Sequence, residues 1–557
     1  MIMKNKKHIN YFFAVALAMV GFATLQSCNK KLDDAYLNPN NPVEGAIEAI
    51  LPNVINQMTS TAAPPTGGGG GSYGPAAEAV TLGKYIQYWN SYTTGDTYDQ
   101  MGGVFATTSD VTGIVWAMHY YGIGPNAKYI ISRGIEQKKW DYVGVAHAIF
   151  AWSWLTLTEE HGEVILRQAF DTERQQFDYD SQADVYDTVR VICDQAIAYL
   201  NRTDGAVSAA NLKYGDGYFY GGDVNKWKKF VYAVKARTFA HLSNKAIYAS
   251  KNYADSVIKY CDLSITSNAD NAVQKWVGGN FSGTNNYYGP YRNNIATLRQ
   301  SAFIANLLTG TNTESPFTGV MDPRTPYLIN ENTNGTYKGV IPNLGSSGLG
   351  TSDQPKNFWR AAFSSTTATA DSGRYIFNNL APFPLLTASE IMFTKAEAAF
   401  RKGNKALALA SYKRGIELNF EMLTSEYQSR IPWANLITPA SQAAYLNDPK
   451  VVPTDPNLLT LSHIMLQKYI ALYGHGFNET WTDMRRYHYV DLDPARGKQV
   501  YAGFTIPATL HIYNAGKLAY RCRPRYNSEY LYNIPALQKI GALASDYHTK
   551  EHWFSLP

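Results

Sequence analysis

The densest group of side chains capable of acid, base or metal chemistry is Glu159, Glu160, His161 and Glu163. Carboxylates beside an imidazole can hold a metal ion or transfer protons. Such a cluster is more commonly the solvated end of a helix, and the chain contains no His-Glu-x-x-His motif that would indicate a metalloprotease. We therefore expect this cluster to be a solvated helix end, and we expect the protein not to be an enzyme.

Other motifs for cofactors are also missing from the sequence. The glycine run between Thr66 and Ser72 lacks the Gly-Lys-Ser/Thr ending that a phosphate-binding loop needs. Cys193, Cys261 and Cys522 lie far apart, without the close spacing of a zinc or redox site. We therefore expect no metal and no other cofactor, and we interpret Cys193 and Cys261 as buried, inert thiols.

The first 28 residues have the layout of a secretory signal. Lys4, Lys6 and Lys7 precede an apolar run from residue 11 to residue 24, which is shorter than the roughly 20 residues of a membrane span. The ending Leu-Gln-Ser-Cys, residues 25–28, resembles a lipoprotein processing site. We expect 1–27 to be a signal peptide and Cys28 to receive lipid chains such as palmitate. A plain signal peptide and a core helix are the alternatives.

The net charge is +5, and it falls to +2 when three lysines of the signal segment are removed. Proteins that bind nucleic acid usually show a clustered basic excess, which is missing here. Aromatic residues are plentiful, with 41 tyrosines and 11 tryptophans in the chain. Tyrosine suits wet binding surfaces as well as cores because it joins a flat apolar ring to a polar tip. We therefore expect no nucleic acid partner and consider an aromatic binding surface.

Two segments outside the clear helical patterns combine aromatic rings with amide or guanidinium groups. Sugars offer apolar ring faces and many hydroxyl groups, so a sugar site needs flat rings and hydrogen-bonding side chains. The alternative for Tyr88 and Trp89 is the core beside an early helix. The candidate ligand-binding residues are Trp89, Asn90, Tyr92, Trp276, Asn286, Tyr287, Tyr288, Tyr291 and Arg292.

Apolar periodicity predicts helices arranged in consecutive pairs. Thr387 and Glu390 have the spacing of a capping box, and Gly403 breaks the pattern between two helices. Such pairs resemble degenerate tetratricopeptide units, which must stack to bury their apolar faces. The expected helices are 143–158, 183–200, 226–249, 253–265, 391–402, 405–423, 462–473 and 478–487.

The segments 270–385 and 424–460 are rich in Gly, Asn, Thr, Ser and Pro and have weak periodicity. Loops of this length in a folded protein are usually functional or disordered, and their aromatic content argues against disorder. We predict a mainly α fold: a superhelical scaffold of tetratricopeptide-like helix pairs whose long irregular insertions form a ligand-binding face. The expected mature domain is 28–557.

Several motifs, in one order along the chain, resemble those of the SusD/RagB family of outer-membrane nutrient-binding lipoproteins, and above all its divergent SusD-like branch. The most specific match combines Gln467-Lys468-Tyr469 with the run from Glu479 to Arg486. We interpret the arginines of this run as scaffold. The other matching segments are 163–186, 221–237, Asp322-Pro323-Arg324, 390–412 and Arg523-Pro524-Arg525-Tyr526 with Glu529 and Asn533.

The resemblance implies a cell-surface lipoprotein, anchored in the outer membrane through Cys28, that covers a SusC-like TonB-dependent transporter. In this role the protein binds an oligosaccharide and passes it to the transporter. Two alternatives stay open. RagB-like members handle peptides, so the ligand of an aromatic, amide-rich cleft can instead be an extended peptide. The second alternative is a structural or adhesive surface protein that makes protein contacts through its tetratricopeptide-like units.

Overall fold

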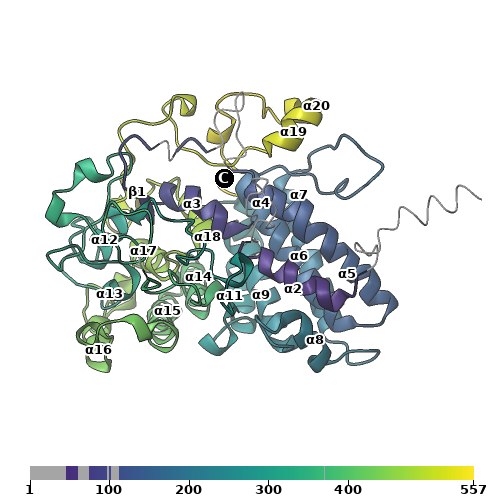
Figure 1. Cartoon of the computed structure of the whole chain (residues 1–557), viewed down its shortest axis with the longest axis horizontal. Coiled ribbons are helices and arrows are strands. Elements are labelled where there is room, and N and C mark those ends of the chain that lie inside the picture. The colour runs from purple at the N-terminus through teal and green to yellow at the C-terminus, as the bar shows by residue number, and fades with distance from the viewer. Residues whose placement is uncertain (1–44, 61–73, 97–98, 102–111, 369) are drawn as a thin grey trace, which may run out of the picture.

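The computed structural model describes residues 45–60, 74–96, 99–101, 112–368 and 370–557. The predicted signal peptide 1–27, Cys28 and the glycine run at 67–71 lie outside these residues. The described chain is mainly helical and builds two large apolar cores. In Figure 1 the helical half lies on the right and the loop-rich half on the left. The mainly α prediction is confirmed.

The helical half encloses one core between long antiparallel helices. Ser181 and Asp223 cap α7 and α9 by accepting hydrogen bonds from backbone amides of the first turn. Gly144 lets α6 and α7 approach closely, because a Cβ there would lie 2.6 Å from Leu200 Cγ. The elements are α2 (Ile47–Gln57), α4 (Ile114–Ala117), the π-helical turn η1 (Met118–Ile123), α5 (Gly124–Glu136), α6 (Trp140–His161), α7 (Gln182–Leu200), α8 (Ala209–Asp216), α9 (Val224–Ala240), α10 (Ala246–Ser250) and α11 (Tyr253–Leu263).

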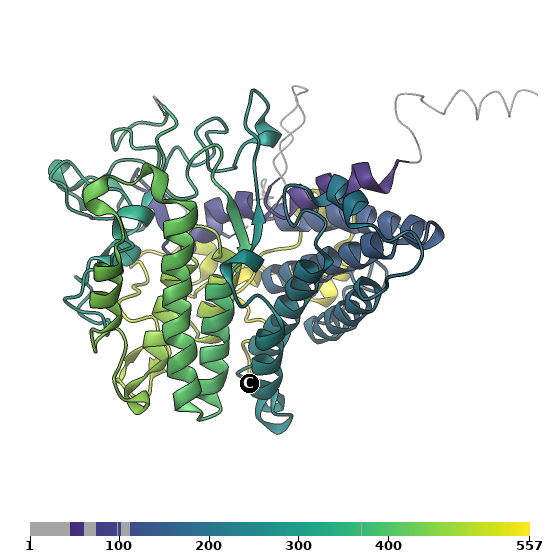
Figure 2. The ribbon, with the colours of Figure 1, turned by 90° about the horizontal axis from the view of Figure 1, so that it is seen from below.

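The loop-rich half is built on helices from the second part of the chain, with α3 packed among them. Figure 2 shows α14 and α15 side by side in green, and Gly403 makes the tight turn between them at φ 85°. The helices are α3 (Pro75–Tyr85), α12 (Ala302–Leu308), α13 (Thr325–Leu328), α14 (Ala388–Arg401), α15 (Lys405–Glu426), α16 (Pro439–Leu446), α17 (Leu461–Ala471) and α18 (Phe477–Arg486).

Of three short antiparallel strand pairs, two hold the long segment 270–385 and the third lies outside the long segments. Trp89 pairs with Gln300 in the first of them, and Ala272 pairs with Leu386 in the second. Apart from these strands, the short helices α12, α13 and α16, several single-turn 3-10 helices and the end of α15, the described residues of segments 270–385 and 424–460 are irregular, in agreement with the prediction. The strands are β1 (Trp89–Ser91) with β3 (Leu298–Gln300), β2 (Ala272–Gln274) with β4 (Phe383–Leu386), and β5 (Leu492–Asp493) with β6 (Lys498–Gln499).

The C-terminal segment returns to the helical half. The Cys522 amide donates to the Glu160 carbonyl at 2.6 Å, and the Phe554 amide donates to Gln182 Oε1 at 3.1 Å. Phe554 is fully buried in the helical core. Two short helices, α19 (Tyr526–Tyr532) and α20 (Ile534–Lys539), lie beside α4 and α7 at the top of Figure 1.

The predicted helix bounds hold to within a few residues, with two corrections. The helix expected over 226–249 ends at Ala240, because a turn follows in which Asn244 Nδ2 bonds to the Arg486 and Ser555 carbonyls. The capping box predicted for Thr387 and Glu390 forms only in part. Thr387 accepts from the Glu390 amide, whereas the Glu390 carboxylate binds Arg237.

Candidate ligand-binding face

Three of the four residues of the cluster at the end of α6 are buried, so the expectation of a solvated helix end was wrong for them, whereas Glu163 is partly exposed and binds Arg521. Glu159, Glu160 and His161 are each at most 2% exposed, because the C-terminal segment covers the end of the helix. Glu159 contacts His241 and accepts from the Tyr186 hydroxyl at 3.2 Å. Burial raises the pKa of Glu160 and lowers the pKa of His161 to about 3.

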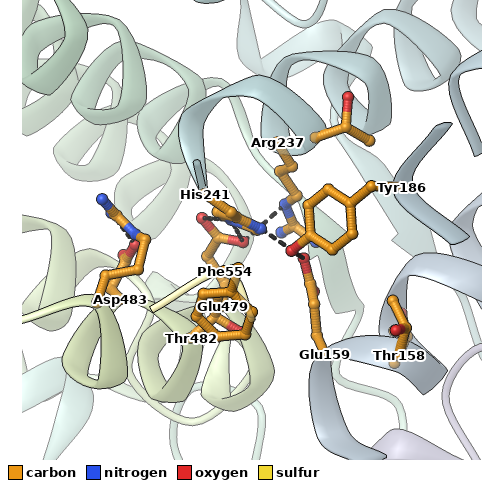
Figure 3. A network of polar contacts seen from close by, with 12 residues as sticks. Thr158, Glu159, Tyr186, Arg237, His241, Glu479, Thr482, Asp483 and Phe554 are labelled. Carbon is orange, nitrogen blue, oxygen red and sulfur yellow. Dashed lines mark hydrogen bonds and ion pairs between the residues drawn. The ribbon is translucent and has the colours of Figure 1, made fainter. Parts of the chain in front are cut away.

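Glu159 belongs to a buried charge network at the junction of the two halves (Figure 3). His241 Nδ1 contacts Glu159 of α6, and His241 Nε2 lies 3.1 Å from Glu479 Oε2 of α18. Burial lowers the pKa of His241, but the two carboxylates outweigh burial and raise it to about 9. His241 is therefore an imidazolium at neutral pH, with both ring nitrogens engaged.

His241, Glu479 and Asp483 lie close enough together to share a metal ion. Lys468 Nζ already bridges the two carboxylates, at 2.7 Å from Glu479 and 2.8 Å from Asp483. Arg237 lies 3.0 Å from Glu479 as well. Because buried cations of the chain itself neutralise these acids, the network stabilises the junction and does not form a metal centre.

The scaffold interpretation of the arginines near residue 485 agrees with this network. Arg486 forms ion pairs with Glu397 at 2.8 Å and with Asp483 at 2.5 Å. Arg485 stacks over Trp481 at 3.7 Å. The three cysteines Cys193, Cys261 and Cys522 are also buried, and burial raises their pKa values, which keeps them as unreactive thiols.

The residues suited to binding a solute lie elsewhere, on what we call the loop face: residues 276–292, 371–382 and 426–433. The Asn286 amide donates to the Asn379 carbonyl at 2.9 Å, and the Tyr291 amide donates to Asn379 Oδ1 at 2.9 Å. The Tyr427 hydroxyl donates to the Pro382 carbonyl at 2.8 Å, and Arg430 binds Asp371. Three segments distant in sequence therefore form one surface.

Large apolar side chains are exposed on the loop face. Phe281 is 51% exposed and Trp433, which begins a short 3-10 turn, is 88% exposed. Leu380 is likewise exposed and lies against Gly278, where a Cβ would come within 2.8 Å of its Cδ2. Single exposed rings are common on proteins, but several on one interlocked surface indicate a contact site.

A small cavity of about 200 Å³ opens between the second and third of these segments, 371–382 and 426–433. Its lining includes the amide of Asn378, the carboxylate of Glu426 and the guanidinium of Arg430. Flat rings beside such hydrogen-bonding groups can hold a polyhydroxylated ring by stacking and converging hydrogen bonds. The full lining is Tyr375, Asn378, Leu380, Ala381, Pro382, Glu426, Tyr427, Ser429 and Arg430.

Two of the three candidate residues of the early segment, Trp89 and Asn90, lie in the core. Trp89 has no exposed surface, donates from Nε1 to the Ala79 carbonyl at 3.1 Å and packs against Tyr288 at 5.6 Å. Asn90 is 1% exposed and donates to Ser301 Oγ at 3.1 Å. Trp89 is therefore a core residue, as the alternative interpretation predicted. Neither side chain reaches the surface.

Asn286, Tyr287 and Tyr288 of the central segment are also buried. Asn286 donates to the Ala381 carbonyl at 2.9 Å and so fixes the loop face from below. Trp276 is half-buried against the loop-rich core, and its Nε1 has no hydrogen-bond partner among the described residues. These side chains form the base of the loop face, and the Trp276 indole nitrogen is buried within it.

Besides half-buried Trp276, three candidates retain exposed surface. Tyr291 is 47% exposed on the loop face. Arg292 is half-buried, stacks over the Tyr287 ring at 4.7 Å and donates to the Ser60 carbonyl at 3.2 Å. Tyr92 is half-buried apart from these residues, with Arg299 over its ring at 4.9 Å. The structure brings Trp276, Tyr291 and Arg292 to one surface and leaves Tyr92 beside Arg299.

Sequence reasoning did not select Leu380, Arg430 or Trp433 as ligand-binding residues. Trp433 follows Pro432 in a polar stretch within the predicted insertion 424–460, and a lone tryptophan in such a stretch was an available signal. No local pattern marks Leu380 or Arg430, because their positions depend on contacts with other loops: Leu380 with Gly278, and Arg430 with Asp371.

With the geometry established, comparisons with known proteins identify the family. The family model for SusD-like proteins, described as starch-binding and associating with the outer membrane, matches residues 39–510. This chain belongs to the SusD-like family. The recognition made from the motifs is thereby confirmed, and the family is one of glycan-binding proteins of the outer membrane. A search among curated proteins found no match.

Solved structures share the fold of this SusD-like chain. A SusD homolog from Bacteroides fragilis is 18% identical, with a TM-score of 0.65 and 91% of this chain and 99% of that chain covered. A SusD/RagB family protein from Bacteroides thetaiotaomicron is 20% identical, with a TM-score of 0.64 and coverage of 92% and 99%. A chitin-binding SusD homolog from Flavobacterium johnsoniae is 17% identical, with a TM-score of 0.60 and coverage of 92% and 98%.

A helix that crosses a bilayer needs about 20 mostly apolar residues. Among the helices in the described ranges, none has both the length and the apolar character of a membrane span.

Proposed function

We propose that this SusD-like protein is a cell-surface lipoprotein that binds an oligosaccharide on its loop face and delivers it to a TonB-dependent outer-membrane transporter. Cys28 carries the lipid anchor in this proposal. The observation that carries it is the presence, on the same loop face, of the exposed rings of Phe281, Tyr291 and Trp433 and of a cavity lined by hydrogen-bonding side chains. Rings of this kind stack on the apolar faces of sugars.

Backbone bonding within the loop face favours a sugar over an extended peptide. A peptide that binds as an added strand needs unpaired backbone amides and carbonyls. The amides of Asn286, Gly289 and Tyr291 are all engaged inside the face. A ligand held through ring faces and side-chain hydrogen bonds suits this arrangement better.

The test is isothermal titration of the lipid-free chain, residues 29–557, with oligosaccharides and with peptide mixtures. Because two structural relatives are described as chitin-binding, oligomers of N-acetylglucosamine are tested beside starch fragments. Concentrations must be high enough to detect millimolar binding, which corresponds to about −4 kcal/mol. We expect saturable heat with one glycan class. Heat with peptides alone would show that the ligand is a peptide and not an oligosaccharide.

Variants of the loop face locate the site. Trp433→Ala and Tyr291→Ala each remove an exposed ring, so folding should be unaffected while glycan affinity falls by about 10-fold or more. Tyr532→Ala, which removes a ring 68% exposed on α19, is the matched control and should leave glycan binding unchanged. Equal affinities for Trp433→Ala and the unaltered chain would place the site off the loop face.

The anchor and the transporter are tested separately. If Cys28 carries the lipid, cells that express the full chain should incorporate labelled palmitate into the protein. Cys28→Ala should abolish this labelling. Co-purification of a TonB-dependent barrel with the lipidated chain tests the partner. Labelling that persists in Cys28→Ala would refute lipid attachment at this residue.

A further inference from the structure

A second, larger cavity lies in the helical half, apart from the loop face. Its volume is about 550 Å³, within the range of small-molecule sites. The walls come from α4, η1, the loop 165–177, α19 and Asn533; Figure 1 labels α4 and α19 near the top of the molecule. The lining residues are Trp116, Tyr120, Tyr121, Ile165, Ala169, Phe170, Arg174, Gln175, Phe177, Ser528, Glu529, Tyr532 and Asn533.

Six of the thirteen lining residues are aromatic. Trp116 and Tyr120 lie 4.8 Å apart between ring centroids, and Tyr120 lies 6.0 Å from Phe170. Tyr121 and Tyr532 are 51% and 68% exposed, so they stand where the cavity meets solvent. Faces of aromatic rings carry partial negative charge, and several rings around one space attract an organic cation.

A carboxyl group lies in the same wall. Glu529 is 6% exposed, and its Oε2 accepts from the Tyr179 hydroxyl at 2.7 Å and from Asn533 Nδ2 at 2.8 Å. Asn533 is fixed in turn by Phe177, whose amide donates to Asn533 Oδ1 at 3.1 Å. The donors to Glu529 are neutral, and no ion pair to Glu529 exists within the described chain.

The arginines near the cavity leave this carboxyl uncompensated. Arg174 is paired with Asp171 at 3.0 Å, and Arg525 lies over the Tyr121 ring at 5.4 Å. Burial raises the pKa of Glu529, because a buried carboxylate without a cation is costly. A bound cation would remove that cost and gain the attraction of the surrounding rings.

We propose that this cavity is a second binding site, for a small organic cation with an ammonium group, held by the aromatic wall and by the Glu529 carboxylate. Nothing in this assignment depends on the glycan proposal, because the cavity shares no residue with the loop face. The ligand class is set by charge and shape: a compact, weakly hydrated ammonium fits aromatic faces better than a strongly hydrated metal ion.

The test compares choline with 3,3-dimethylbutan-1-ol, which has the same shape but no charge, on the chain 29–557. Titration calorimetry and the change in intrinsic tryptophan fluorescence, to which Trp116 of the cavity wall contributes, report binding. We expect choline to bind at least about 10-fold more tightly than the neutral analogue. Equal binding of the two compounds, or no binding of choline at millimolar concentration, would overturn the proposal.

Variants assign the site to Glu529 and the rings. Glu529→Gln keeps a hydrogen-bond acceptor but no charge, and it should weaken choline binding by about 10-fold. If Glu529→Gln does not fold, Tyr121→Ala and Tyr532→Ala test the site through exposed side chains, and each should weaken choline binding. Trp433→Ala is the control that should leave choline binding intact. Unchanged choline affinity in both tyrosine variants would also refute the site.

Discussion

His241 Nε2 lies 3.1 Å from Oε2 of Glu479, and this contact joins the helical half of the molecule to the loop-rich half. Both side chains are fully or almost fully buried. A buried charge is tolerated only when it is paired and hydrogen-bonded, so removal of one partner leaves the other at a large energetic cost. The junction between the halves is therefore sensitive to protonation and to single substitutions.

The first prediction concerns pH. The pKa of His241 in the folded chain is about 9, above its ordinary 6.5, so its contribution to stability is complete below pH 6.5 and is lost as pH rises through 9. We expect the free energy of unfolding to fall by up to about 3 kcal/mol over that window. Chemical denaturation at a series of pH values measures this loss.

The control for the pH experiment is His241→Gln. Burial raises the pKa of Glu78 to about 8. The Glu78 carboxyl ionises more easily in the unfolded chain, so it also lowers the free energy of unfolding as pH rises towards 8. The difference in pH slope between the unaltered chain and His241→Gln isolates the histidine. Identical slopes in the two proteins would show that His241 is not protonated in the fold.

The second prediction concerns the Asp322-Pro323-Arg324 motif. Arg324 binds Asp322 at 2.6 Å and Gln467 Oε1 at 2.6 Å, deep in the loop-rich core. Arg324→Met leaves the Asp322 carboxylate buried without its cation, which should cost about 3–5 kcal/mol. Arg414→Met, at a 41% exposed side chain paired with Glu421, should cost less than about 1 kcal/mol. Equal midpoints in urea for the two variants would contradict this account.

The third prediction uses the close approach of α3 to Trp89. A Cβ at Gly83 would lie 2.5 Å from Trp89 Cε2, so Gly83→Ala forces the buried indole to move. We expect a loss of about 1–3 kcal/mol, although alanine is normally the better residue in a helix. Gly350→Ala, which meets nothing within 4 Å, is the matched control. Thermal unfolding of both variants gives the comparison, and a Gly83→Ala variant as stable as Gly350→Ala would refute it.

The fourth prediction separates core tryptophans from surface tryptophans. Trp89→Ala should destabilise the chain by about 3–5 kcal/mol because it empties a packed site. Trp433→Ala should change stability by no more than about 0.5 kcal/mol. Circular dichroism during heating measures both. If Trp89→Ala kept full stability and lost only glycan binding, Trp89 would be a ligand-binding residue after all.

Much of the scaffold is predictable because its determinants are local. The helices near residue 400 follow from apolar spacing, from Thr387 as a cap and from Gly403 as a turn, and all three lie within one short stretch. The end of the helix predicted over 226–249 was missed because it depends on Asn244, whose partners Arg486 and Ser555 are more than 240 residues away.

The site is less predictable for the same reason. A tryptophan in a polar segment looks alike whether it is exposed or buried, and Trp89 is buried by Phe358, Phe377 and Tyr473, all at least 269 residues away. Glu159 looked solvated because its partner His241 lies in another helix pair. The composition of a segment indicates the chemistry it can offer, whereas distant packing decides which side chains offer it.

The return of the C-terminal segment to the helical half affects the order in which the protein can be completed. Phe554 and Cys522 reach that half last, although α6 and α7 are made early in synthesis. At roughly 5–20 residues per second, the nascent helices wait for tens of seconds before the final segment emerges from the ribosome. A chain exported as we propose must cross the inner membrane unfolded, and this delay keeps its first half open for transport.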